Sequence, residues 1–565
     1  MVDARTELAR LSDELFALQH GTDPFSATML GVAGFDHRVP DPSRAAARTA
    51  AAGFAALEQQ ADALDTTGLS EDERTNAAVL ARLAWGARSD LEHGLWEAGA
   101  SAAAYANPQA LLFQAVPSAP LPDRAAVASY LTRLGGLGGY LDAIGARYRE
   151  ATRDGRTSTQ VGVAQALDQL HGHLSLVGEQ DTLLTVALPA DVDAVTVRAQ
   201  AAVVLVEQVR PALQRLSATL RDVVAPKARD DDHVGIRHVP GGEQGYHAAV
   251  RRHTTTDLDP AEIHEIGRQC LRELAEEWAE IGGRALGTTD VVEVRRRLRE
   301  DPSLRFTDTR QIVDVVTGAL ERAEAARDAW FPAYDVAPCV VEEINPLEAG
   351  NAALAYYRPP AGDGSRPGAH CVLTADPGAR FTYEYEALAF HESTPGHHLQ
   401  IASAQRLPRL PAYRRFLDAE VCGYVEGWGL YCERLADEMG LYTSDLARLG
   451  MLSFDALRAC RLVVDTGMHL HGWSRQRAMQ FLWENTATTR SNVANETSRY
   501  ISWPGQALAY MIGRREIVRL RTDAEQALGP AFDVRAFHGV VLGQGAVPLD
   551  VLARNVSRWV AAAQS

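Results

Sequence analysis

The stretch FTYEYEALAFHESTPGHHLQ, residues 381–400, has a helical pattern in its first half and a proline-glycine pair in its second. Two histidines four residues apart on one helix face can share a zinc ion, with the glutamate after the first histidine as a general base. The fourth residue after His391 is Pro395, and a straight helix would not bring His391 and His397 to one metal. The stretch is therefore either a plain turn or a zinc site with altered spacing.

Pro395 and Gly396 favour the second alternative. A proline inside a helix clashes with the carbonyl four residues before it and cannot donate a hydrogen bond, and glycine adopts the backbone geometry that such a break requires. If the pair is extruded as an insertion, the remaining residues read H-E-S-T-H. We therefore predict that His391 and His397 bind zinc and that Glu392 is the base.

A third ligand is expected in the downstream segment GYVEGWGLYCERL. Glu426 has apolar and aromatic neighbours, among which an unpaired carboxylate is costly to bury. Glu433 and Glu438 have charged neighbours and are expected to be solvated. Glu426 is the predicted third ligand, and the alternative is a salt bridge from Glu426 to an arginine such as Arg414 or Arg458.

The composition is that of a globular protein. Of 565 residues, 46% are hydrophobic and 23% charged, and the net charge is −17. No lysine- or arginine-rich block occurs, so we expect neither nucleic acid nor a membrane as a partner. The chain has no run of about 18 apolar residues and no signal-peptide pattern, which predicts a cytoplasmic location. The six cysteines form no C-x-x-C pair, and the oligomeric state stays open.

Hydrophobic periodicity predicts a mainly α protein. Apolar residues recur at three- and four-residue spacing over residues 1–224, the predicted N-terminal helical part. Residues 225–247 are rich in charge, glycine and proline and are expected to be a long connection or a lid. Residues 225–565 form the predicted catalytic part, packed with the first part as one unit. A small sheet is predicted at 338–375, from PCVVEEI and HCVLTAD, with a tyrosine pair in a loop between them.

The chain resembles a known bacterial family in HESTPGHHLQ, VEGWGLYCERL, DTGMHLHGWS, RYISWPGQALAYMIG and AFDVRAFHGVVLGQGAVPL. This family is domain of unknown function 885, and the similarity extends to ATMLGVAGFDHRVPDPS and GGEQGYHAAVRRHTTTDLDPAEIHEIG. Its members are regarded as zinc-peptidase-like, with a fold similar to the carboxypeptidase Taq family and the neurolysin-like peptidases. The resemblance implies a large helical clamshell-like zincin fold, with one small β-sheet beside the active-site helix.

By this resemblance His391, His397 and Glu426 take the metal-ligand positions, and Glu392 takes the position of the base. The position matching His398 can be tyrosine in related sequences, which favours His397 over His398 as the ligand.

The segment WPGQALAYMIG is similar to a tryptophan-glycine segment of carboxypeptidase Taq-type enzymes. By that similarity Tyr510 is a candidate donor to an oxyanion, with a packed core aromatic as the alternative. His469, His471 and His538 are further candidates for the wall of the site, with a structural role as the alternative for each.

These residues predict a zinc metallopeptidase, either a carboxypeptidase or a dipeptidase, that acts on short peptides. Zinc with three protein ligands lowers the pKa of water to about 7 and polarises a carbonyl. Glu392 would accept the proton and pass it to the leaving amine. The alternatives are a zinc hydrolase of a non-peptide amide or ester, and a binding scaffold without metal.

Two features are expected to hold the substrate. An exposed edge strand at residues 371–374 would pair with the main chain of a peptide. Arginines near Tyr510 would hold its terminal carboxylate by paired hydrogen bonds, and their alternative role is as solvated helix charges. The candidates are Arg499, Arg514 and Arg515.

Overall fold

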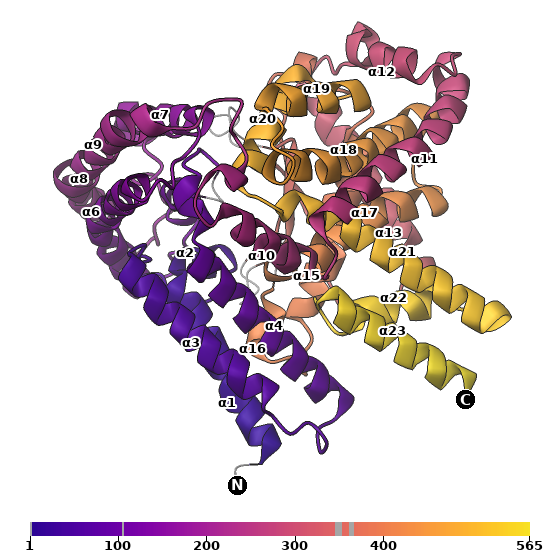
Figure 1. The fold of residues 1–565 in the computed structure, drawn as a ribbon, viewed down its shortest axis with the longest axis horizontal. Coiled ribbons are helices and arrows are strands. Elements are labelled where there is room, and N and C mark those ends of the chain that lie inside the picture. The colour runs from indigo at the N-terminus through magenta and orange to yellow at the C-terminus, as the bar shows by residue number, and fades with distance from the viewer. Residues whose placement is uncertain (1–2, 104–106, 345–352, 361–365, 418) are drawn as a thin grey trace.

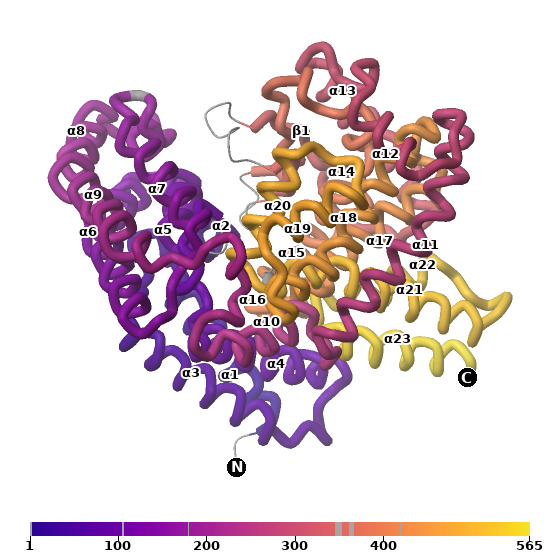
Figure 2. The backbone as a smooth tube through the Cα atoms, turned by 45° about the horizontal axis from the view of Figure 1, so that its top comes forward, coloured from indigo at the N-terminus to yellow at the C-terminus, as the bar shows by residue number. Residues whose placement is uncertain are grey.

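The structure is a computed structural model and describes residues 3–103, 107–344, 353–360, 366–417 and 419–565. Helices make up most of these residues, and the strands within them form one small sheet. The predicted mainly α fold is therefore confirmed. Figures 1 and 2 show an arm built from α5 to α9 on one side and a larger body, which carries most of the later helices, on the other.

The helices before residue 225 follow the predicted periodicity, and the described residues there contain no strand. They are α1 (Ala4–Thr22), α2 (Pro24–Met29), α3 (Arg44–Asp62), α4 (Glu71–His93), α5 (Pro108–Ala115), α6 (Arg124–Arg153), α7 (Gln160–Ser175), α8 (Ala194–Val204) and α9 (Arg210–Thr219).

The helices after residue 225 build the body. They are α10 (Gly242–Thr254), α11 (Pro260–Leu286), α12 (Val291–Glu300), α13 (Thr309–Trp330), α14 (Tyr385–Glu392), α15 (His397–Gln405), α16 (Ala412–Arg415), α17 (Cys422–Glu438), α18 (Asp445–His469), α19 (Arg475–Asn485), α20 (Arg490–Ser502), α21 (Ala509–Leu528), α22 (Val534–Gly543) and α23 (Leu549–Gln564).

Residues 225–247 join the two parts as a packed connection. Val234 and Ile236 are buried in it, and the backbone N–H of Ile236 donates to Nδ1 of His469 at 3.0 Å. The connection is shorter than predicted, because residues 242–247 already form the start of α10. The segment therefore packs as a connection in this structure, and its role as a lid stays a prediction.

The largest apolar cluster crosses the predicted boundary between the parts. It joins Leu15 of α1 and Leu80 of α4 to Leu452 of α18 and Leu552 of α23. A second cluster includes Leu137 of α6 and joins the arm to Phe25 of α2. The division at residue 224 itself stays a prediction.

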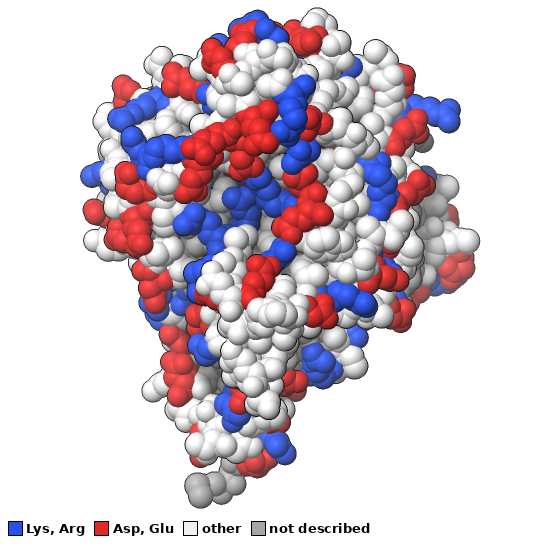
Figure 3. Space-filling model, turned by 90° about the vertical axis from the view of Figure 1, so that its right-hand side faces the viewer, with Lys and Arg blue, Asp and Glu red and all other residues white. Residues whose placement is uncertain are grey.

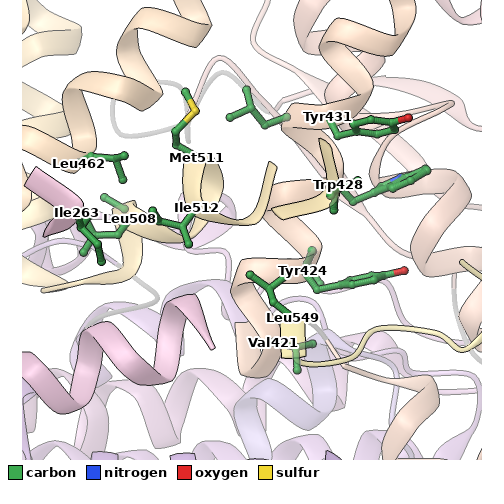
Figure 4. Packing of buried hydrophobic residues seen from close by; sticks show 14 of the residues in the cluster. Ile263, Val421, Tyr424, Trp428, Tyr431, Leu462, Leu508, Met511, Ile512 and Leu549 are labelled. Atoms are coloured by element: carbon green, nitrogen blue, oxygen red, sulfur yellow. The ribbon is translucent and has the colours of Figure 1, made fainter. Parts of the chain in front are cut away.

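Helices α17 and α21 cross at glycines. A Cβ atom on Gly427 would lie 2.6 Å from Cα of Gly513, so no larger residue fits between the two backbones. Figure 4 shows Met511 and Ile512 grouped with Ile263 and Leu462, while the labelled aromatic side chains of α17 lie on the other side of the view and point away from them. This close crossing brings the start of α21, with Tyr510, to the helix that carries Glu426.

The predicted sheet is present, with a third strand between the two predicted ones in the sequence. It consists of β1 (Val340–Glu343), β2 (Ala355–Arg358) and β3 (Ala369–Val372) in the order β1-β3-β2, with β1 parallel and β2 antiparallel to β3. Two predictions were wrong. Tyr356 and Tyr357 lie in β2 rather than in a loop. Because β3 has a strand on both sides, residues 371–374 do not form an exposed edge. Residues 345–352 and 361–365 lie outside the described residues.

Positive and negative side chains are interspersed on the face shown in Figure 3. None of the described helices combines the length and the apolar character that crossing a bilayer requires. Of the six cysteines, all free, five are buried and Cys339 is partly exposed. The absence of nucleic-acid and membrane partners stays a prediction.

Candidate metal centre

The helix that carries His391 ends at Glu392, and a new helix begins at His397. The proline-glycine insertion therefore separates two helices instead of bulging from one. A Cβ atom on Gly396 would lie 1.9 Å from the carbonyl oxygen of His391. Only glycine allows the chain to turn back so close to α14, and this turn brings His397 to His391.

Helix α17 holds the turn in place. The carbonyl oxygen of Pro395 accepts a hydrogen bond from Nε1 of Trp428 at 3.0 Å and a weaker one from Sγ of Cys432 at 3.3 Å. The hydroxyl of Thr394 donates to Glu324 at 2.6 Å. Because these contacts are buried or partly buried, the position of His397 is fixed relative to α17.

His391, His397 and Glu426 come together as predicted. Nε2 of His391 lies 3.6 Å and Nε2 of His397 lies 3.5 Å from Oε2 of Glu426. One ligand atom from each residue lies within 4.8 Å of the others. The two imidazole rings are nearly perpendicular, with centroids 4.7 Å apart.

This spacing fits a zinc ion better than a set of hydrogen bonds. Hydrogen bonds in proteins are about 2.7–3.2 Å long. Two ligand atoms of a tetrahedral zinc with bonds of about 2.0–2.2 Å lie roughly 3.3–3.6 Å apart. The alternative salt bridges are absent: Arg458 pairs with Glu433, and Arg414 donates to Asn76. Two histidines and a glutamate are also a ligand set of catalytic zinc sites.

The charges of the group favour a cation. Burial alone would lower the pKa of His391, but the carboxylates of Glu426 and Glu433 outweigh it and raise this pKa to about 9. Burial alone would raise the pKa of Glu426, yet contacts with His391 and His397 hold it well below the usual value. The three side chains therefore stabilise positive charge between them, which a divalent metal would supply.

Glu433 is the residue that the sequence prediction misplaced. It was expected to be solvated, but its side chain is fully buried and its Oε1 lies 2.8 Å from Nδ1 of His391. The charged neighbours that suggested exposure point elsewhere: Arg434 pairs with Glu277 and Asp455, and Asp437 pairs with Arg448.

The spacing on α17 could have revealed Glu433. It follows Glu426 by seven residues, which is close to two helical turns and places both carboxylates on one face. Between them, a Cβ atom on Gly429 would lie 2.7 to 3.0 Å from three ring atoms of His391. The imidazole therefore lies against the bare backbone of α17, with one nitrogen toward each glutamate.

Glu392 and Tyr510 lie beside the three ligands. Burial raises the pKa of Glu392, and the neighbouring His391 and His397 oppose this shift. The ring of Tyr510 is nearly parallel to that of His391, at 6.4 Å between centroids. Burial raises the pKa of Tyr510, so its hydroxyl keeps its proton and can donate it in a hydrogen bond. Glu392, Glu426 and Tyr510 each remain partly exposed.

The other candidate histidines have structural contacts. In three of them, both ring nitrogens lie within hydrogen-bond distance of other groups. These are His398 with Tyr357 and Ala337, His469 with Ile236 and Tyr500, and His538 with Trp330 and Tyr431. His471 is exposed and packs edge-on against His264. Both ring nitrogens of His398 therefore have partners within the protein, which favours His397 over His398 as the candidate ligand.

The three candidate arginines have different surroundings. Arg514 donates to the buried Asp455 at 2.5 Å, and Arg515 is exposed with Nη1 3.7 Å from Sγ of Cys270. Arg499 pairs with Glu496 near Tyr510. Of the three, Arg499 is the one that lies near the candidate centre.

Solved structures that are similar to this chain include two whose titles describe putative lipoproteins. One is titled "The crystal structure of the putative lipoprotein from Colwellia psychrerythraea"; it has 26% identity and a TM-score of 0.91, with 100% of each chain covered. The other, titled as a putative lipoprotein of unknown function from Shewanella oneidensis, has 17% identity and a TM-score of 0.71, with 97% of this chain and 99% of that chain covered. At that identity it supports the fold alone. These titles do not support the predicted cytoplasmic location.

No curated protein matches the chain significantly. The sequence model described as "Bacterial protein of unknown function (DUF885)" matches residues 24–556. Since this match covers most of the 565 residues, the chain belongs to that family.

Proposed function

We propose that this protein is a zinc-dependent metallopeptidase that hydrolyses short peptides. The observation that carries the proposal is the group of His391, His397 and Glu426, in which both distances to Oε2 of Glu426 match the spacing of ligand atoms in a tetrahedral zinc site. The family and the similar structures come without a stated activity, so the proposal depends on the side chains of this chain.

A zinc ion held by these three residues would lower the pKa of water to about 7 and polarise a carbonyl. Glu392 directly follows the first ligand and is the group that accepts the proton of the attacking water. The same carboxyl group then passes this proton to the leaving amine. Its partial burial and raised pKa suit a group that must hold the proton between the two steps.

Two further residues support this chemistry. The carboxylate of Glu433 accepts a hydrogen bond from Nδ1 of His391, which leaves the lone pair of Nε2 directed to the metal position. Tyr510 would donate its hydroxyl proton in a hydrogen bond to the oxygen that becomes negative when the peptide carbonyl is attacked. The ring contact with His391 sets its distance from the ligands.

The test uses the zinc-loaded protein and Glu392→Gln as its matched control, since glutamine keeps the size of the side chain and removes the base. We offer unstructured peptides of graded length, a folded protein, and simple aryl esters and amides. We expect cleavage of the peptides, loss of about 10²- to 10⁴-fold in rate in the variant, and sparing of the folded protein. If only the esters are cleaved, the protein is a non-peptide hydrolase and not a peptidase. If no substrate is turned over, both activities are refuted.

The cytoplasmic location stays a prediction and needs its own test, because similar structures are titled as putative lipoproteins. Fractionation of the native cells, with detection of this protein in each fraction, is direct. Recovery with the soluble cytoplasmic proteins is expected, and recovery with the membrane fraction would contradict the prediction.

A further inference from the structure

We propose that Arg458 and Arg461 form a subsite that binds the terminal carboxylate of the substrate, on the Tyr510 side of the candidate metal centre. The inference rests on the proposed function, because it names the group by which that site selects its substrates. The substrate class is then peptides with a free α-carboxylate.

The first step of the argument is position. Arg458 and Arg461 lie three residues apart on α18 and therefore project from one face of this helix. The guanidinium carbon of Arg461 lies 4.3 Å and that of Arg458 lies 5.9 Å from the ring centroid of Tyr510. The same ring lies 6.4 Å from the ring of His391. Both guanidinium groups therefore lie near the ring of Tyr510, and that ring lies next to the candidate ligand His391.

The second step is the state of their N–H groups. Both side chains are buried, at 5% exposure each. Within the part of the chain that the structure describes, Nη1 of Arg461 has no hydrogen-bond partner, and neither Nη1 nor Nε of Arg458 has one. Buried donors in folded proteins nearly always have a partner, because leaving one unpaired is costly. These donors are consistent with a partner that arrives with the substrate.

The third step is the balance of charge. Arg461 and Arg499 share one carboxylate, with Nη2 of each at 2.8 and 3.2 Å from Oε2 of Glu496. Arg458 reaches Glu433 at 3.3 Å, and that carboxylate is already paired with His391. At Glu496, two guanidinium groups therefore share one carboxylate. An added anion would relieve this local excess of positive charge, and a guanidinium binds a carboxylate through two parallel hydrogen bonds.

The distances also limit how a peptide could lie. The separations of 6.4 Å and 4.3 Å place Arg461 within a short distance of His391. An extended chain covers about 3.3–3.6 Å per residue, so one to three residues bridge this interval. A carboxylate held at Arg461 would therefore put a peptide bond near the C-terminus over the metal position, as release of one to three residues requires.

The experiment measures binding rather than turnover. Zinc-loaded protein carrying Glu392→Gln is equilibrated with a mixture of N-acetylated tripeptides, in free-acid and C-terminally amidated forms, and bound peptides are quantified by equilibrium dialysis. The measurement is repeated with protein that carries Arg461→Gln in addition to Glu392→Gln. A further protein carries the conservative change Arg461→Lys instead. Arg515→Gln is the matched control, because Arg515 is exposed and lies on the helix of Tyr510. Glu496 keeps Arg499 as a partner in the variants, and thermal melting shows whether each is folded.

We expect the acids to bind on the order of 10- to 100-fold more tightly than the amides, as for a hydrogen bond to a charged group. Arg461→Gln should remove this preference, Arg461→Lys should keep part of it, and Arg515→Gln should leave it intact. Three results would overturn the subsite: acids and amides bind equally, neither binds, or the folded Arg461→Gln variant keeps the preference for acids. In the last case Arg461 acts only as a support for Tyr510.

The experiments distinguish failure of the carboxylate subsite from failure of the proposed peptidase activity. If acids and amides are cleaved equally well by the wild type, the metallopeptidase stands and the subsite falls. If acids bind selectively through Arg461 but no peptide is cleaved, the subsite stands and the proposed activity falls.

Discussion

Nδ1 of His391 lies 2.8 Å from Oε1 of Glu433, and both side chains are buried. An ionised carboxylate can only accept a hydrogen bond, so this contact keeps the proton of the imidazole on Nδ1. The other nitrogen, Nε2, faces Glu426 and would direct its lone pair to a metal bound between them. A histidine that binds a metal commonly has such a partner, which orients the ring and increases its basicity.

Replacing Glu433 should therefore weaken zinc binding without removing a ligand. We expect Glu433→Gln to lower the affinity for zinc by about 10- to 100-fold, the usual effect of losing such a partner. Competition with a chromophoric chelator measures this affinity. Glu438→Gln is the control, since Glu438 lies on the same helix, is exposed and pairs with Arg521. Equal affinities in both variants would mean that the contact with His391 does not tune the metal.

Adding one methyl group at Gly429 should have a related effect by a steric route. Its Cβ atom would lie 2.7 Å from Cε1 of His391, so the ring must move away from its place on α17. We expect Gly429→Ala to weaken zinc binding by roughly 10- to 100-fold, as for loss of support of a ligand. Gly139→Ala on α6 is the control, because no atom lies within 4 Å of its added Cβ. Calorimetric titration with zinc is the measurement, and an unchanged affinity would show that the ring adapts.

Deleting Pro395 and Gly396 restores an ordinary H-E-S-T-H sequence but should lower activity. The carbonyl of Pro395 is held by Trp428 and Cys432, and the rest of the site is built around this turn. A displacement of about 1 Å can cost on the order of 10²-fold in rate. The rate of peptide cleavage is compared with that of the wild type at equal zinc content. Activity as high as in the wild type would show that the insertion is incidental.

The pH dependence of stability should reflect Asp465 on α18. Burial raises the pKa of Asp465 to about 7, although its carboxyl accepts hydrogen bonds from Tyr246 and from the backbone N–H of Gly505. The usual pKa of an aspartate is 3.8, so between about pH 4 and pH 7 the folded state holds a proton that the unfolded state has lost. The carboxyl of Asp465 therefore makes the free energy of unfolding fall as the pH rises from about 4 to about 7.

We expect Asp465→Asn to reduce this fall, because asparagine does not ionise and can still accept from Tyr246. Urea unfolding at pH 5 and pH 7.5 compares the variant with the wild type. A fall of the same size in both proteins would show that Asp465 ionises in the folded state as it does in the unfolded chain.

Local sequence patterns predicted the helical fold, and they selected the three side chains of the candidate metal centre that the structure brings together. Helical periodicity depends on residues close together in the chain, and the break at Pro395 follows from the chemistry of proline itself. Glu426 was found because its neighbours along the helix are apolar. Each of these signals needs no knowledge of what packs against the segment.

The errors concern contacts between distant segments. Glu433 has charged sequence neighbours, but its environment is set by His391 on another helix. The central place of β3 depends on how β1 and β2 pair with it, and the order of strands along the chain does not determine this. The open donors of Arg458 and Arg461 depend likewise on the positions of Glu433, Glu496 and Tyr510 in space.

The zinc content of the purified protein tests the central claim most directly. After zinc is supplied and excess is removed by dialysis, we expect about one zinc per chain in the wild type. His397→Ala and Glu426→Ala should each lose most of it, while His471→Ala, in which an exposed histidine is removed, should keep it. Wild-type protein without zinc, or zinc that persists when both His397 and Glu426 are replaced, would contradict the account.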